Sequence, residues 1–378
     1  MSPDTDVEMI RETARRFAQA ELAPGAAERD RTSAAPLKEL KQLGELGLMA
    51  VAVPEEWGGA GASYSALTMA VEEVSRADAS IGVVMSTHNS LACMPIVQHG
   101  TEEQKQRFLP ALVSADTIGA IAITESQAGS NAADIRTRAE RTHDGYVLNG
   151  AKQFITGGAF AGLAVLLAST DAEAGPRGIT CFLVPTDAPG FSTGKPEEKL
   201  GIRASGTAQL ILENVRLDDS HVLGKPGEGY KIILGALARS RLGIAAQAVG
   251  IAQAALDESL AYAKERTSFG QPIIEHQAVG FRLATMATEI EAARRLTYHA
   301  AALLDAGQPF QKESSMAKLY ASEMAERVCS QGLQVLGGYG YLSDYPLERL
   351  YRDARICQIY EGTSDIQRMV IGRMLATG

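Results

Sequence analysis

Five short polar segments rich in glycine interrupt an otherwise apolar chain, and they contain the residue types best suited to chemistry. They are AITESQAGS at 122–130, FITGG at 154–158, ERTSFGQP at 265–272, QVLGGYGY at 334–341 and IYEGTSDIQR at 359–368. Hydroxyl groups can orient a ligand, and glycines let backbone amides come close to it. Arg266, at a predicted helix break, is suited to hold a phosphate group. Each segment taken alone is also typical of a helix cap or a turn.

Several common kinds of catalytic site are missing from the sequence. It has no HExxH, Walker A or GxSxG motif, and no GxGxxG segment follows a strand-like run, which disfavours a nicotinamide-binding Rossmann unit. The six histidines show no metal-ligand spacing, so we predict no metal site. The four cysteines lie far apart in the sequence and are expected to be buried thiols.

The composition indicates a globular protein with an acidic surface. The chain has 378 residues, 46% of them hydrophobic and 21% charged, which excludes a wholly disordered protein. Thirty-six basic and 45 acidic residues give a net charge of -9, which disfavours nucleic acid or an anionic membrane as the main partner. No uninterrupted apolar run approaches the roughly 20 residues of a membrane span. The acidic N-terminal segment lacks a signal-peptide pattern, so we predict a cytoplasmic protein.

The order of the expected elements divides the chain into three blocks. Apolar residues three or four apart predict helices at 4–20, 35–46, 63–76 and 101–112 in a first block, residues 1–116. Short apolar runs at 164–168 and 179–184, separated by turn signals such as Asn149-Gly150, predict a block of short strands at 117–227. From 228 to 378, helical spacing over many turns predicts a bundle. These elements have to position the five polar segments.

In this order and at these distances, the five segments resemble the acyl-CoA dehydrogenase family. The resemblance covers nearly the whole chain, from VPEEWGG at 53–59 to YRDARICQIYEGTSDIQR at 351–368, and the sequence looks most like the short-chain, or butyryl, branch. It implies an α+β fold with an N-terminal helical domain, a central β domain of short strands and a C-terminal four-helix bundle. It also implies bound FAD, assembly as a homotetramer and an electron-transfer flavoprotein as electron acceptor.

The resemblance assigns most of these polar residues to the FAD site. The residues implied around the flavin ring are Ile121, Ala122, Ile123, Thr124, Ser130, Phe154, Ile155 and Thr156. Those implied around the ADP part, across a subunit boundary, are Arg266, Phe269, Gln277, Gln334, Gly337 and Gly338. Thr363 and Asp365 would complete the site. An arginine supplies charge to the pyrophosphate, and glycines let the backbone approach it.

Glu361 is the residue that the resemblance implies as the catalytic base. The family removes the α-proton of an acyl-CoA thioester while the β-hydrogen leaves as hydride to the flavin, giving a trans-2-enoyl-CoA, a step of fatty acid β-oxidation. Hydrogen bonds to the thioester carbonyl, one of them from the Glu361 backbone amide, would stabilise the developing charge. Expulsion of water would raise the carboxylate pKa. The implied substrate-binding residues are Ser130, Arg241, Tyr360 and Gly362.

Two positions distinguish this chain from other branches of the family. Relatives in the isovaleryl branch have their base on a bundle helix, where this chain has Ser240, which cannot act as one. Glutaryl-type relatives have an arginine for the distal carboxylate, where this chain has Gly82. We therefore expect a short- or medium-chain, uncharged acyl group. The departures from the family pattern are Ser126, Gln127, Asn131, Phe154 and Ala238.

The sequence leaves two other functions open. An oxidase or monooxygenase on the same fold would pass electrons to oxygen, and the sequence does not distinguish it from a dehydrogenase. A non-catalytic helical binding protein would keep the fold without the chemistry. The presence of Glu361, Arg266 and the glycines disfavours this second alternative.

Overall fold

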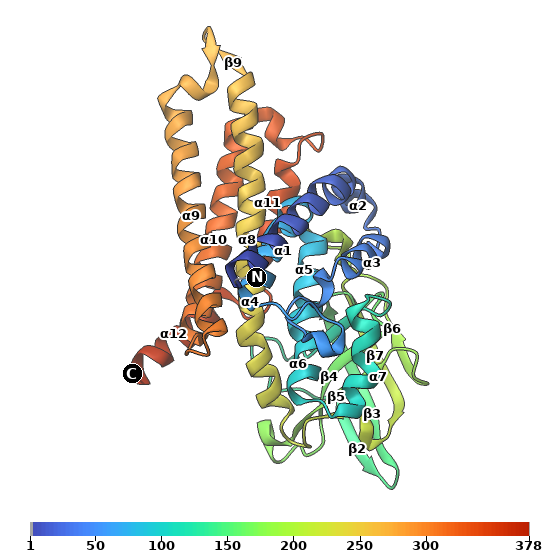
Figure 1. Cartoon of the computed structure of the whole chain (residues 1–378). Helices are drawn as coiled ribbons and strands as arrows, with labels where there is room; N and C mark the ends of the chain where they lie inside the picture. Colours follow the sequence, from blue (N-terminus) through green and yellow to red (C-terminus); the bar gives the residue numbers. More distant parts are fainter. Residues whose placement is uncertain (1–2, 378) are drawn as a thin grey trace.

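The N-terminal part of the computed structural model, which describes residues 3–377, is helical, as the sequence predicts (Figure 1). Its α-helices are α1 (Pro3–Phe17), α2 (Ala26–Thr32), α3 (Leu37–Glu45), α4 (Tyr64–Ala77), α5 (Ala79–Thr87), α6 (Met94–His99) and α7 (Glu102–Val113). The predicted helices correspond to α1, α3, α4 and α7, whereas α2, α5 and α6 come in addition. Every residue of α5 is buried, so the helix has no polar face that would reveal its period in the sequence.

The middle part forms one eight-stranded sheet. Its strands are β1 (Gly119–Ala122), β2 (Arg138–Thr142), β3 (Gly145–Ile155), β4 (Leu163–Ser169), β5 (Ile179–Pro185), β6 (Phe191–Thr193), β7 (Ala208–Leu217) and β8 (Val222–Leu223). The strand order is β6-β7-β3-β2-β4-β5-β8, and β1 pairs with β4 in parallel. The two predicted apolar runs correspond to β4 and β5.

The turn predicted at Asn149-Gly150 is wrong, because both residues lie inside β3. The pairing of β3 with β7 is irregular at this point, between Leu148 and Gly150. Gly150 has a φ of 148°, and a Cβ atom there would lie 2.6 Å from Thr137 Oγ1 on the neighbouring chain segment. Gly150 therefore allows a bulge inside the strand and lets the segment containing Thr137 pack closely against it.

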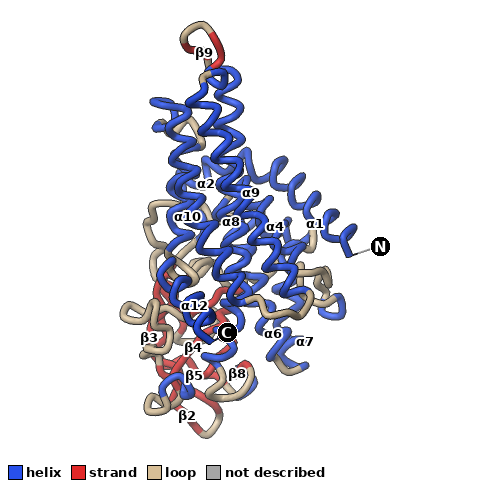
Figure 2. Tube along the Cα trace, turned by 90° about the vertical axis from the view of Figure 1, so that its left-hand side faces the viewer, coloured by secondary structure: helices blue, strands red, loops and turns tan. Residues whose placement is uncertain are grey.

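The C-terminal part is a bundle of three long helices, α8 (Gly229–Glu265), α9 (Gln277–Asp305) and α10 (Gln311–Leu336), with the shorter α11 (Leu347–Arg355) as the fourth. A small hairpin of β9 (Thr267–Ser268) and β10 (Gln271–Pro272) joins α8 to α9 at the tip of the bundle. Figure 2 shows this tip extending beyond the rest of the molecule, while α12 (Ser364–Thr377) lies toward the other end of the bundle.

The strand β4 is buried on both faces, and this joins the sheet to the helices. Leu163, Val165 and Leu167 belong to the large core that also contains residues of α4, α5 and α8. Ala164 and Leu166 belong to a second core inside the β part. Because successive side chains of a strand point to opposite faces, such a strand needs a continuous apolar run. The large core contains residues of all three predicted blocks, so it marks no boundary between them. The predicted domains 1–116, 117–227 and 228–378 therefore stay predictions.

Two helical stretches, Ala79–His99 and Gly229–Glu265, have the length and apolar composition of a membrane span. Of their most apolar windows, 94% and 78% respectively are buried inside the structure. A helix that packs against protein on most sides is apolar for that reason alone. The cytoplasmic location stays a prediction.

Candidate active site

Glu361 lies on the loop between α11 and α12, in a backbone conformation that residues other than glycine rarely adopt. Its φ is 52°, and that of the following Gly362 is 91°. A left-handed non-glycine residue costs on the order of 1–3 kcal/mol and persists only where its surroundings hold it. Here Lys318 Nζ donates a hydrogen bond of 2.7 Å to Gly362 O, and Gln367 Nε2 donates one of 2.9 Å to the same oxygen. The loop is thus held from both α10 and α12.

Only one of the two carboxyl oxygens of Glu361 has a hydrogen-bond partner among the described residues. The Ser240 hydroxyl group, on α8, donates a hydrogen bond to Oε2. Oε1 is buried and has no hydrogen-bond partner in residues 3–377. Burial raises the pKa of Glu361 to about 7, although the Ser240 hydrogen bond and the charges of Lys318 and Arg241 act in the opposite direction. A carboxylate of near-neutral pKa with a free oxygen is suited to accept a proton.

Two buried cations lie beside this carboxylate. Lys318 is fully buried and Arg241 is 8% exposed. Burial lowers the pKa of Lys318 to about 8, although the negative charge of Glu361 acts to raise it. Arg241 donates a hydrogen bond of 3.0 Å to Ser315 Oγ, and its Nε has no partner in the described part of the chain. The structure therefore brings Arg241, a predicted substrate residue, next to the predicted base, together with Lys318, which was not predicted.

Tyr360, another predicted substrate residue, connects the Glu361 loop to α8 and α5. Its hydroxyl group donates to Gln247 Oε1, and Gln247 Nε2 donates a hydrogen bond of 2.9 Å to Ala79 O. Burial raises the pKa of Tyr360 well above its usual value, so its hydroxyl group stays a neutral donor. Gln247 is fully buried and was not predicted, since a single glutamine on an apolar helix gives no sequence signal.

The first two polar segments meet at the ends of β1 and β3. Gln153 N donates a hydrogen bond of 2.8 Å to Thr124 O, which places the loop after β1 beside β3. Lys152, fully buried on β3, donates hydrogen bonds from Nζ to Ile123 O at 3.1 Å and to Glu125 Oε1 at 2.7 Å. A lysine inside the sheet thus fixes the loop that contains the predicted flavin residues.

The carboxylate of Glu125 organises the same loop. It accepts hydrogen bonds from the backbone nitrogens of Arg136 at 2.6 Å and Thr137 at 3.0 Å. Burial alone would raise the pKa of Glu125, but the charge of Lys152 and these donors outweigh it and lower the pKa to about 2. The pair of Glu125 and Lys152 is therefore ionised at neutral pH. Neither residue is among the predicted site residues, because a buried ion pair between a loop and a strand leaves no pattern in the sequence.

The predicted flavin residues differ in what they can offer a ligand. Phe154 has a φ of 59° and is 62% exposed, and Ser130 is exposed. Ile121, Thr124 and Thr156 are half-buried. The side chains of Ala122, Ile123 and Ile155 are buried in the protein core, so these three residues can contribute only backbone groups to a bound ring. Thr363 and Asp365 lie at the start of α12, where Thr363 Oγ1 accepts from Ile366 N at 3.3 Å.

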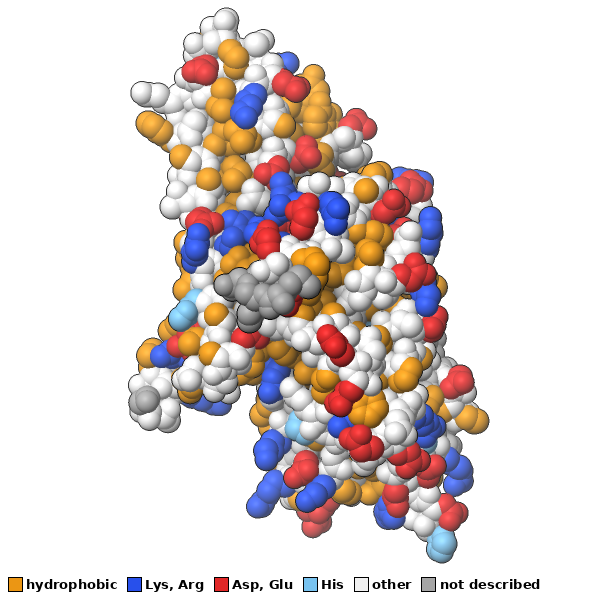
Figure 3. Space-filling view, in the orientation of Figure 1, with side chains coloured by type: hydrophobic (Ala, Val, Ile, Leu, Met, Phe, Trp, Pro, Cys, Tyr) orange, Lys and Arg blue, Asp and Glu red, His pale blue; other side chains and the backbone are white. Residues whose placement is uncertain are grey.

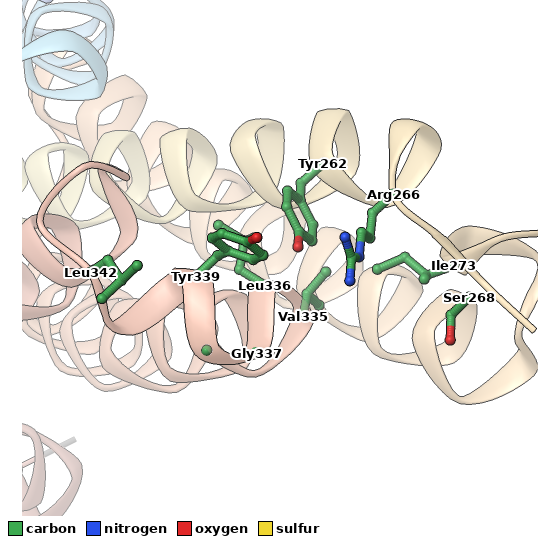
Figure 4. A pocket seen from close by; sticks show the side chains of 10 residues that line it. Tyr262, Arg266, Ser268, Ile273, Val335, Leu336, Gly337, Tyr339 and Leu342 are labelled. Atoms are coloured by element: carbon green, nitrogen blue, oxygen red, sulfur yellow. The ribbon is translucent and has the colours of Figure 1, made fainter.

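The remaining predicted cofactor residues gather at the tip of the bundle. A cavity of about 470 Å³ lies there, lined by Arg266, Gly337, Gly338 and Tyr339 among others (Figure 4). The Arg266 guanidinium lies 5.9 Å from the centre of the Tyr339 ring. A Cβ atom at Gly337 or Gly338 would meet nothing within 4 Å, so their backbone is open to a ligand. Phe269, Gln277 and Gln334, also predicted, are exposed at the same tip.

Two sets of the predicted residues lie far apart along α8. Glu361, Arg241, Tyr360 and Gly362 lie together around Ser240 of α8. Arg266 and its neighbours lie at the far end of the same helix, about 39 Å from Ser240 at 1.5 Å per residue. One chain by itself does not bring the two groups together.

The same order of a helical, a β and a helical part occurs in solved structures of dehydrogenases, one of them in complex with FADH2. Three family models match the chain in the same order: the acyl-CoA dehydrogenase N-terminal domain over 4–116, the middle domain over 120–215 and the C-terminal domain over 227–376. The chain belongs to the acyl-CoA dehydrogenase family, which uses FAD.

Individual relatives resemble almost the entire chain. The mitochondrial short-chain specific acyl-CoA dehydrogenase of Mus musculus is 50% identical over 369 residues, which make up 98% of this chain and 89% of that protein. The structure of butyryl-CoA dehydrogenase from Megasphaera elsdenii has a TM-score of 0.96 and 40% identity, and the match covers 98% of each chain. A chain solved in work on the electron transferring flavoprotein of Acidaminococcus fermentans has a TM-score of 0.97 and 43% identity, over 99% and 98% of the two chains.

The fold alone does not select the acyl group. A glutaryl-CoA dehydrogenase from Mycobacterium smegmatis, solved in complex with FADH2, has a TM-score of 0.93 and 33% identity over 99% of this chain and 95% of that one. Enzymes named for different acyl groups thus share the architecture, and the substrate has to be argued from individual residues.

Proposed function

We propose that this protein is an FAD-dependent dehydrogenase that converts a short- or medium-chain acyl-CoA to the trans-2-enoyl-CoA, with Glu361 as the base. The observation that supports this most directly is the Glu361 carboxyl group, whose Oε1 is buried without a partner in residues 3–377 and whose pKa is raised to about 7. Family membership and the likeness to a butyryl-CoA dehydrogenase support the substrate class.

In this proposal Glu361 Oε1 takes the α-proton of the thioester. Lys318 and Arg241 favour the ionised carboxylate before the transfer, and burial favours the neutral acid after it. The backbone amide of Glu361 donates to the thioester carbonyl, where charge develops. Gly362 has no side chain to place beside the thioester, and a Cβ atom there would lie 2.7 Å from Gln367 Nε2, so a larger residue would disturb the loop. FAD, when bound, supplies the acceptor for the β-hydride.

The exposed residues at the two sites fit the two parts of FAD. At the tip, the Arg266 guanidinium and the open backbone of Gly337 and Gly338 match a pyrophosphate, which needs positive charge and close amide donors. On the β part, Phe154 offers an aromatic surface and Thr124 offers a hydroxyl group to a flat polar ring. Of the other residues predicted for FAD, Phe269, Gln277 and Gln334 would join Arg266, and Ser130, Thr156, Thr363 and Asp365 would join Phe154.

A second copy of the chain would complete each FAD site. The group around Glu361 lies beside Ser240 and the ADP group lies at the C-terminal tip of α8, about 39 Å away along the helix, so the two would serve different FAD molecules in a homotetramer. Large apolar side chains are exposed at the tip, with Phe269 96%, Phe281 67% and Tyr341 86% exposed. Figure 3 shows hydrophobic side chains gathered along the upper part of the bundle. Exposed apolar surface of this kind is typical of an interface between chains.

The packing around Gly82 supports an uncharged acyl group. Gly82 lies where α5 packs against α4, and a Cβ atom there would be 2.0 Å from Ser75 Oγ. An arginine at this position would require α4 to move, so the cation expected for a dicarboxylyl substrate has no room. The 50% identity to a short-chain specific enzyme supports a short acyl chain.

Anaerobic bleaching of the flavin absorbance tests this proposal. The FAD-loaded protein is mixed with acyl-CoA thioesters of four to sixteen carbons and with glutaryl-CoA, and the Glu361→Gln variant serves as the matched control. We expect the wild type to bleach fastest with the shorter thioesters, and the variant to bleach hardly at all. A preference for glutaryl-CoA or for the longest chain would contradict the substrate assignment, and no response to any thioester would contradict the activity.

Reoxidation of the bleached protein tests the electron acceptor. An electron-transfer flavoprotein is the proposed partner, supported by the likeness to the chain from the Acidaminococcus fermentans work. We expect it to restore the flavin absorbance rapidly and oxygen to do so slowly. Rapid reoxidation by oxygen would instead indicate an oxidase.

A further inference from the structure

Ser240 differs from other buried hydroxyl residues of the bundle in where its hydroxyl group bonds. Serine and threonine inside a helix usually donate to the carbonyl group four residues earlier in the same helix. Ser259 on α8 does so to Ala255 O at 2.6 Å, and Thr297 on α9 does so to Ala293 O at 2.8 Å. Ser240, fully buried on α8, donates instead to Oε2 of Glu361, a residue far away in the sequence.

We propose that Ser240 is a positioning residue for the catalytic base: its hydroxyl group holds Glu361 Oε2 and so leaves Oε1 as the oxygen that takes the substrate proton. This inference rests on the proposed function, in which Glu361 is the base. Ser240 keeps its own proton throughout. The proton that leaves the α-carbon is bound by Oε1, and Oε2 then accepts the Ser240 hydrogen bond as the carbonyl oxygen of the neutral acid.

The geometry around the carboxyl group supports this division of roles. Oε1 is buried and lacks a partner among the described residues, whereas Oε2 has one. An ionised carboxylate held through one oxygen cannot rotate freely, which fixes the direction in which the other oxygen points. A base held in the direction of its substrate needs less reorganisation in the transition state.

The hydrogen bond also affects the charge state of the base. Ser240 bonds to the ionised form and so lowers the Glu361 pKa, in opposition to burial. The other groups that face Glu361 are Lys318 from α10 and Arg241 from α8, which lower its pKa, and Tyr360, which is neutral and adjoins it in the chain. These groups remain when Ser240 is replaced, so removal of the hydroxyl group should change one contribution only.

Three variants of the FAD-loaded protein test the inference: Ser240→Ala, Ser240→Thr and the control Ser259→Ala on the same helix. Alanine is a good helix former, so both alanine variants should keep α8 intact. The first readout is a pH titration of the Glu361 carboxyl stretch by difference infrared spectroscopy, without substrate and with Glu361→Gln as the blank. The second is the acid limb of kcat/KM, which reports the pKa of the free enzyme.

We expect Ser240→Ala to raise both midpoints by about one to two pH units, as for the loss of a hydrogen bond to a charged group. Ser240→Thr should restore them toward the wild-type values, and Ser259→Ala should leave them unchanged. An unchanged infrared midpoint in Ser240→Ala would overturn the inference. If no thioester bleaches the wild type, the proposed function fails, yet the infrared titration still decides whether Ser240 controls Glu361.

Discussion

Two regions along α8, one around Ser240 and one at its C-terminal end, differ in how complete they are within a single chain. Around Ser240, the polar groups are largely buried and bonded to residues of α8, α10 and α12. At the tip, Arg266 is exposed, its guanidinium lies 5.9 Å from the centre of the Tyr339 ring, and Phe269 is 96% exposed. Folding of one chain thus builds the geometry around the proposed base, whereas the tip presents exposed groups that a ligand or another chain would cover.

The substitution Glu361→Gln should have the largest effect on the region around Ser240 and leave the tip of α8 unaffected. The amide keeps the shape of the side chain and removes the base, so we expect kcat to fall by about two to four orders of magnitude. FAD content and thermal stability should stay close to wild type, because the tip is unchanged. Stopped-flow flavin reduction measures the loss. Turnover near the wild-type rate would show that the base lies elsewhere.

The variant Lys318→Met tests whether the Glu361 loop depends on the hydrogen bond from Lys318 to Gly362 O. Methionine can occupy much of the space of the buried side chain, but Gly362 O loses its 2.7 Å donor and the left-handed turn is held less firmly. We expect kcat to fall by up to about 100-fold, as for a small misplacement of a reacting group, with a smaller change in KM. Removal of the positive charge should also raise the Glu361 pKa.

Lys312→Met is the matched control for this variant. Lys312 lies on the same helix, is 37% exposed and pairs with Glu313 at the surface. Its replacement should leave kcat and the pH profile unchanged. Equal kinetics of Lys318→Met and wild type would show that the hydrogen bond from Lys318 is not needed to position Glu361.

The sequence predicts the fold well where elements are amphipathic or are bounded by turns. The helices α4 and α7 begin within a residue of their predicted starts, since Ser63 and Thr101 cap them. In contrast, α5 has no polar face because it is buried on all sides. The Asn149-Gly150 signal is typical of a turn, but the same dipeptide serves a bulge in β3, and only the pairing with β7 distinguishes the two.

The residues proposed to contact a ligand are easier to predict than the residues that hold their segments in place. Glu361 and Arg266 belong to polar segments that stand out in an apolar chain. The residues that fix those segments do not stand out, because Lys152 lies in an alternating strand and Lys318 in an ordinary helical stretch. Their function follows from burial and from one partner each, Glu125 Oε1 and Gly362 O, which are distant in sequence.

At the C-terminal end of α8, Arg266→Ala should weaken FAD binding while the chemistry remains. The loss of one charge-assisted contact to a phosphate corresponds to an increase of at least about tenfold in the FAD dissociation constant. The flavin-to-protein absorbance ratio after dialysis measures it, and sedimentation velocity follows the oligomer. Lys264→Ala, another exposed cation at this helix end, is the control. Unchanged FAD retention in Arg266→Ala would remove Arg266 from the proposed cofactor site.

The smallest expected effect concerns the length of the acyl chain, which should depend on the region around Glu361 alone. One methylene group in an apolar pocket is worth about 0.8 kcal/mol, so thioesters of four and five carbons should differ in kcat/KM by only about fourfold. Arg266→Ala, measured with saturating FAD, should keep the same ratio because Arg266 is proposed to contact the pyrophosphate of FAD and not the acyl chain. A changed ratio in that variant would mean that the tip influences the acyl site, and the two regions could then no longer be treated as separate in function.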